Sequence, residues 1–179
     1  MSAALVVALL LAAVLAPLGG AGGAATAAQQ QKKDYLSPLE ADQIRDAVTI
    51  SERVKLFLGY AADRLRKIDY ELERKDKEKD RDWNERMWSL INGYAGCVDD
   101  AADALQAGLE KQENLRPGTK ELEKRTKEFL PKVKALKENP LLSAFKSDLD
   151  DAIEATQDAA TTAENVAKEL SAAPERRRP

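Results

Sequence analysis

The sequence contains no histidine and a single cysteine, and these two scarcities exclude many kinds of active site. Without an imidazole there is no Ser-His or Cys-His nucleophile pair, no zinc site with histidine ligands and no histidine-ligated haem. Cys97 has no second cysteine with which to form an internal disulfide. The sequence also lacks a glycine-rich phosphate loop. We therefore expect a protein that is not an enzyme and that has no cofactor.

The sequence also has few aromatic residues and a small net charge, and both bear on the class of protein. Aromatic residues make up 5% of the 179 residues, whereas 44% are hydrophobic and 33% are charged. This composition is typical of a helical protein with one domain. The 28 basic and 31 acidic residues leave a net charge of −3, too small for a field that would favour nucleic acid.

The first 27 residues resemble an export signal. Residues 3–16 form an unbroken apolar run, shorter than the roughly 20 residues of a membrane span. Ala25-Thr26-Ala27 fits an A-x-A cleavage pattern, so we expect a periplasmic or secreted protein after cleavage near Ala27, with only transient membrane contact. Because Met1-Ser2 adds no basic side chain, an uncleaved N-terminal membrane anchor is the alternative. Residues 28–36 are then expected to form a flexible tether.

Residues 37–172 carry the periodicity of one helical-bundle domain. Ser37 with Glu40, and Thr49 with Glu52, are capping boxes that predict a short helix from 38 to about 48 and a new helix after it. Apolar residues then recur at spacings of three and four, which predicts four long helices. We expect an all-α, up-down antiparallel bundle in which the short N-terminal helix occupies space left by the short third helix. The expected inward positions are Val54, Leu58, Ala61, Leu65, Ile68, Leu72, Trp83, Met87, Leu90, Ile91, Tyr94, Val98, Ala101, Leu105, Leu109, Leu122, Thr126, Phe129, Leu130, Val133, Leu136, Leu142, Phe145, Leu149, Ile153, Thr156, Ala160, Ala163, Ala167 and Leu170.

Two connections and the third long helix carry signals of their own. Residues 73–82 contain no glycine or proline, so the sequence permits one continuous rod, but a capping box at Asp82 and Glu85 favours a hairpin turn. Thr119 is expected to open the third long helix, and Pro131 should kink it or end it early. Asn139-Pro140 predicts the turn into the last helix.

A repeated acidic pattern is the strongest candidate for chemistry. At 100° per residue, Asp99 and Asp103 have the same offsets from Val98 that Asp150 and Glu154 have from Leu149. If the two helices brought these carboxylates together, they would supply oxygen ligands for calcium or manganese. A solvated acidic face is the more ordinary interpretation, and we favour it.

Three further features are candidates for interaction. Gly93, Cys97, Ala104 and Gly108 form a ridge of small residues, which predicts a closely packed neighbour and a buried Cys97 thiol. A redox-active or dimer-forming thiol is the alternative. Trp88 lies about 80° from the apolar stripe of its helix and is a candidate partner platform. Residues 173–179 should be a disordered tail in which Arg176, Arg177 and Arg178 could contact an anionic surface.

These features predict a non-catalytic, exported bundle that binds another macromolecule or associates with itself. The partner would be a protein or another component of the cell envelope, and the oligomeric state stays open. The alternative is a carrier of a small ligand or of a divalent metal ion held by the helix carboxylates.

Overall fold

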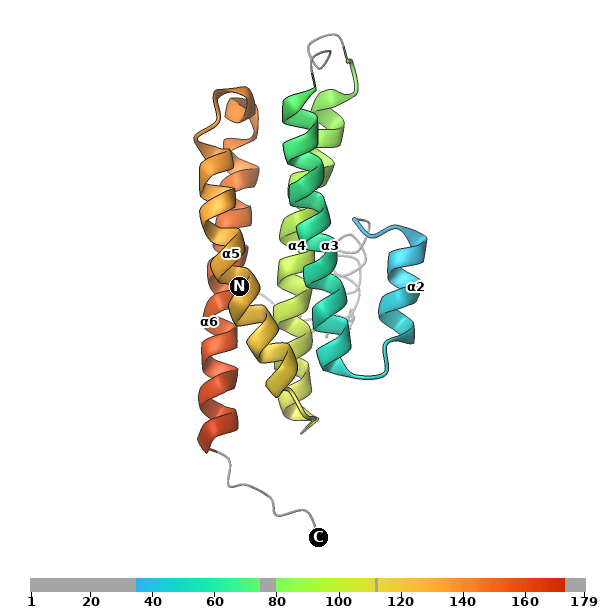
Figure 1. The fold of residues 1–179 in the computed structure, drawn as a ribbon, viewed down its shortest axis with the longest axis vertical. Coiled ribbons are helices and arrows are strands. Elements are labelled where there is room, and N and C mark those ends of the chain that lie inside the picture. Colours follow the sequence, from blue (N-terminus) through green and yellow to red (C-terminus); the bar gives the residue numbers. More distant parts are fainter. Residues whose placement is uncertain (1–34, 75–79, 112, 173–179) are drawn as a thin grey trace, which may run out of the picture.

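A computed structural model of the protein describes residues 35–74, 80–111 and 113–172, and within these ranges it contains helices but no strand (Figure 1). The predicted all-α helical bundle is confirmed. The predicted signal peptide, residues 28–34 of the predicted tether and the basic tail lie outside the described residues. The elements are α2 (Pro38–Asp46), α3 (Ile50–Glu73), α4 (Trp83–Glu110), α5 (Arg116–Lys137), a 3-10 helix η2 (Pro140–Phe145) and α6 (Lys146–Ala172).

Side-chain caps start the first two helices as predicted. Ser37 and Glu40 form a complete capping box at α2, and Thr49 and Glu52 form another at α3. The third predicted box is wrong, because Asp82 makes no side-chain cap hydrogen bond at the start of α4. Its backbone (φ −95°, ψ 2°) departs from the extended conformation that an N-cap residue usually adopts.

The long helices form two antiparallel hairpins, α3 with α4 and α5 with α6 (Figure 1). The helix interrupted between Glu73 and Trp83 therefore turns back, which confirms the hairpin and excludes the continuous rod. Each hairpin buries its apolar seam against the other.

The two hairpins meet through parallel helices, an arrangement that the up-down prediction did not contain. Helix α4 packs on α6, and Asn92 near the start of α4 donates to Asp148 near the start of α6. Helix α3 likewise packs on α5, where Ser51 accepts a hydrogen bond from the Gly118 amide. Helices α4 and α5, which are consecutive in sequence, consequently lie across the diagonal of the bundle with few mutual contacts.

The predicted seams form one continuous core. At its centre the Tyr94 ring meets the Phe129 ring edge to face at 5.8 Å, and the Tyr94 hydroxyl lies 2.6 Å from Thr156 Oγ1. Most predicted inward positions are fully buried. Those that are only partly buried lie at the margins of the seams: Leu72, Trp83, Leu90, Leu109, Leu130, Ile153, Ala160, Ala167 and Leu170.

Helix α5 differs from its prediction at both prolines. It begins at Arg116 rather than at Thr119, because Pro117 fits the first turn, where its missing amide costs no hydrogen bond. Pro131 lies in the interior of the helix, yet α5 continues to Lys137, with the proline on the exposed side. The predicted early end is therefore wrong.

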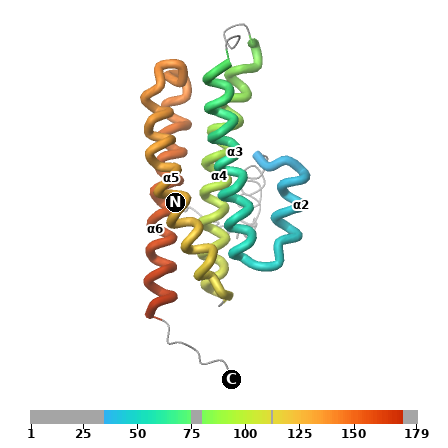
Figure 2. The backbone as a smooth tube through the Cα atoms, in the orientation of Figure 1, coloured from blue at the N-terminus to red at the C-terminus, as the bar shows by residue number. Residues whose placement is uncertain are grey.

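The short helix α2 lies against α3, on the side of the α3–α4 hairpin away from α5 and α6 (Figure 2). The expectation that it would fill space beside the third long helix is wrong. Residues 35–48, called the α2 arm below, thus form an appendage outside the four-helix core. Within the described ranges, no helix combines the length and the apolarity that crossing a membrane requires.

Candidate functional site

The α2 arm is attached to the bundle by Tyr35. Its hydroxyl donates to the carbonyl oxygen of Gly96 (2.8 Å) and contacts Oδ2 of Asp100 on α4. Gly96 is required for this contact, since a Cβ there would lie 2.7 Å from Cδ1 of the tyrosine ring. Burial, followed by the hydrogen bond to Asp100, raises the pKa of Tyr35 above its usual value. Tyr35 and Leu36 were expected in the flexible tether, and the structure instead places them against the core.

An ion pair holds the first turn of α2. Arg64 of α3 is only 7% exposed, and its guanidinium binds both carboxylate oxygens of Glu40. The same guanidinium donates to the Tyr35 carbonyl oxygen at 3.2 Å. The hydrogen bonds from Arg64 to Glu40, together with those from Ser37, lower the pKa of Glu40 to about 2. Glu40 therefore serves both as part of the α2 capping box and as the counter-ion of a buried cation.

Beneath this contact lies Cys97, whose thiol is fully buried. Burial raises its pKa to about 12, so the thiol is protonated at neutral pH and is a poor nucleophile. The predicted buried role of Cys97 is confirmed. The ridge of small residues around it packs closely as predicted, with Gly93 against Arg64 and Gly108 against Leu115 and Ile50.

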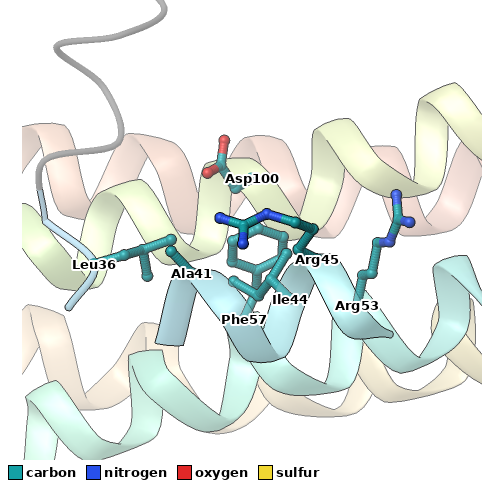
Figure 3. A pocket seen from close by; sticks show the side chains of 7 residues that line it. All are labelled: Leu36, Ala41, Ile44, Arg45, Arg53, Phe57 and Asp100. Carbon is teal, nitrogen blue, oxygen red and sulfur yellow. The ribbon is translucent and has the colours of Figure 1, made fainter. Parts of the chain in front are cut away.

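Between α2, α3 and α4 the arm leaves a cavity of about 320 Å³ (Figure 3). Apolar side chains from the arm and the Phe57 ring of α3 form part of its wall, and two arginines and one aspartate add charge. The cavity exists because α2 buries none of its residues completely, so its apolar face does not fill the space over α3. The lining residues are Leu36, Ala41, Ile44, Arg45, Arg53, Phe57 and Asp100.

The four carboxylates of the metal hypothesis are not assembled into a metal site. Among the described residues, no group of three or more His, Cys, Asp or Glu side chains is placed to hold a metal ion. Asp150 lies on the flank of α6 that faces α5, where it pairs with Lys137, whereas α4 is reached by Asp148. Equal offsets on two helices therefore do not bring Asp99 and Asp103 to face Asp150. Asp103 and Glu154 are exposed.

Trp88 is 53% exposed on α4, near the end of the bundle where α3 ends and α4 begins. Trp83, by contrast, packs its ring against Phe145 at 6.2 Å, in agreement with its place on the core stripe. The predicted contact residues Arg176, Arg177 and Arg178 lie outside the described residues.

Sequence reasoning missed Tyr35, Arg64 and the cavity. Arg64 immediately precedes Leu65, a buried position of the α3 seam, and nothing in its spacing indicates that Glu40, 24 residues earlier, would reach it. The sequence did contain one indication of this contact: helix α4 carries three glycines, at positions 93, 96 and 108. Glycines in a helix indicate that other side chains approach its backbone closely there.

No family model, no curated protein and no solved structure matches this chain.

Proposed function

We propose that the protein is a non-catalytic, exported helical bundle that binds another macromolecule of the cell envelope. The supporting observation is a group of exposed apolar side chains at one end of the bundle. Tyr70 in the last turn of α3, Trp88 near the start of α4 and Leu141 in η2 are 66%, 53% and 47% exposed. Single exposed apolar residues are ordinary on protein surfaces, but tryptophan and tyrosine are the types enriched in interfaces. Their presence at the same end favours a contact surface there.

Site-specific photo-crosslinking tests this function. A photoreactive residue at position 88 should capture a partner when the protein is expressed in its native envelope. The matched control is position 106, also exposed on α4 but in its last turns. Capture at 88 and not at 106 supports the proposal, and a cross-link between two copies would identify the partner as the protein itself. If neither position gives an adduct and the protein is recovered only as free monomer, the proposal fails.

Export is the second part of the proposal and is supported by residues 1–27 of the sequence. The mass and the N-terminal sequence of the protein isolated from its host test it. A chain that starts near Ala28 supports cleavage and export. A full-length chain in the membrane fraction supports the anchored alternative, and a full-length chain in the cytosol contradicts export.

A carrier of a small ligand is the second candidate, and the cavity beside the α2 arm favours it. Its volume of about 320 Å³ lies at the lower end of the range for small-molecule sites, about 300–1,000 Å³. Mass spectrometry of the gently purified protein under native conditions tests this function. Added mass that denaturation removes supports it, and the bare mass of the chain contradicts it.

A further inference from the structure

We infer that the cavity beneath α2 binds a small amphipathic anion, namely a molecule with a short apolar body and one carboxylate or similar acidic group. This inference rests on the carrier function proposed above and specifies its site and ligand class. It follows from the shape of the cavity, from the chemistry of its walls and from the state of its charged groups.

The apolar part of the ligand would contact the arm and α3. Phe57 is buried in the core, yet its ring lines the cavity, and Leu36 and Ile44 oppose it from the arm (Figure 3). Because α2 lies over this wall without filling it, an apolar molecule placed here would displace water from both surfaces. Removal of apolar area from water favours binding.

The charge of the ligand follows from Arg53. Its Nε donates to the Ala47 carbonyl oxygen at 3.4 Å, and no carboxylate of the described residues forms an ion pair with its guanidinium. Its remaining donors are thus available beside an apolar wall. A guanidinium in such a place binds a carboxylate by charge-assisted hydrogen bonds.

The other two charged groups at the cavity already have partners. Arg45 pairs with Asp42 at 2.6 Å on the exposed side of α2. Asp100, the acidic group of the lining, accepts a hydrogen bond from the hydroxyl of Tyr35. Arg53 is therefore the charged group of the lining that has no side-chain partner among the described residues, and its free donors favour an anion over a cation.

The attachment of the arm leaves room for entry. Polar contacts fix its first turn through Glu40, its middle through the hydrogen bond from Tyr60 of α3 to Gln43 (2.6 Å), and its far end through the Thr49 capping box. Because the cavity is partly open to solvent between these attachments, a ligand can enter it without breaking them.

Titration calorimetry with sodium decanoate tests the inference on the full mature chain. Decanoate should bind, and Arg53→Met, which keeps the apolar stem but removes the charge, should weaken binding about tenfold. Ala41→Leu should abolish binding by filling the cavity. Arg66→Met is the matched control, since Arg66 is exposed on the same helix and pairs with Asp63 outside the cavity. It should bind as the unmodified protein does.

Decyltrimethylammonium has the same chain length and the opposite charge. Comparison of its affinity with that of decanoate distinguishes a site specific for anions from a site that binds any apolar chain. The inference fails if decanoate does not bind, if Arg53→Met binds it equally well, or if the cationic amphiphile binds as tightly. Thermal midpoints show that each variant is folded. Native mass spectrometry separates this failure from failure of the carrier function: a bound molecule that persists in Ala41→Leu overturns the site but leaves the function standing.

Discussion

The four-helix core and the α2 arm are held in place by different kinds of interaction. The core buries long apolar seams from α3, α4, α5 and α6, including residues such as Leu58 and Leu105 that have no exposed surface. The arm buries no residue of α2. It is attached by polar contacts, namely the hydroxyl of Tyr35, the ion pair between Glu40 and Arg64, and the hydrogen bond from Tyr60 to Gln43.

This contrast means that the two regions should respond to different perturbations. Burial of apolar surface is insensitive to protonation, so the core should lose stability chiefly when volume is removed. Hydrogen bonds and ion pairs depend on charge, so the arm should detach when a group of its attachment titrates. A binding surface at the arm would therefore be adjustable without unfolding of the bundle.

Removal of volume from the core should give the largest effect. Leu105→Ala should lower the free energy of unfolding by about 2–5 kcal/mol, because a fully buried side chain is replaced by a cavity. Chemical denaturation followed by circular dichroism measures it. Loss of less than about 1 kcal/mol would show that the centre of the bundle is loosely packed.

Gly96→Ala should give an intermediate effect, confined to the arm. The added Cβ would overlap the Tyr35 ring and detach it, at a cost of about 1–3 kcal/mol. The control is Gly59→Ala on the exposed face of α3, where a Cβ has no neighbour within 4 Å; it should stabilise the helix by up to about 1 kcal/mol. Hydrogen exchange should rise in residues 38–46 for Gly96→Ala alone. Equal exchange in the two variants would mean that the tyrosine does not hold the arm.

The smallest effect should come from pH and should also be confined to the arm. Glu40 has a pKa lowered from 4.5 to about 2, so its stabilising contribution is complete above pH 4.5 and is lost as the pH falls through about 2. The raised pKa of Tyr35 has the opposite sign: its contribution is complete below pH 10 and is lost only at higher pH. Hydrogen exchange of residues 38–46, corrected for the intrinsic rate at each pH, should rise in acid before that of residues 50–73.

Glu40→Gln is the control for this titration. Its arm should already exchange faster at neutral pH, and the acid transition should be absent. An arm that stays protected down to pH 2 in the unmodified protein would show that the ion pair does not secure it.

The core could be predicted from sequence because its signals are local. Seam positions such as Val54, Leu58 and Val98 recur with helical spacing, and each helix shows its own buried face whatever its neighbours are. Pairing is a different matter. The apolar pattern of a helix does not indicate which other helix covers it, so the sequence could not distinguish α5 from α6 as the neighbour of α4. The parallel contact between α4 and α6 was therefore missed.

The candidate site could not be predicted because it depends on long-range polar contacts. Arg64 and Glu40 are ordinary charged helix residues in the sequence, and only the fold brings them together. The carboxylates of the acidic repeat are not brought together for the same reason, since the orientation of α6 turns Asp150 toward Lys137. By contrast, the burial of Cys97 was predictable because its small neighbours lie on the same helix.

The hydroxyl contact between Tyr94 and Thr156 fixes how far the two hairpins can slide along each other. The face of α6 there is rich in alanine, including Ala152, Ala155 and Ala159. Because these side chains are small and alike, apolar packing alone would permit several alignments of α6 along α4. Since Thr156 donates to the Ala152 carbonyl oxygen, Tyr94 must donate to Thr156. A shift of α6 by one turn would leave the Tyr94 hydroxyl buried without an acceptor, at a cost of about 1–3 kcal/mol. This buried hydrogen bond thus sets the register of α4 and α6 at the centre of the core, and the bond from Asn92 to Asp148 supports the same register nearer the start of both helices.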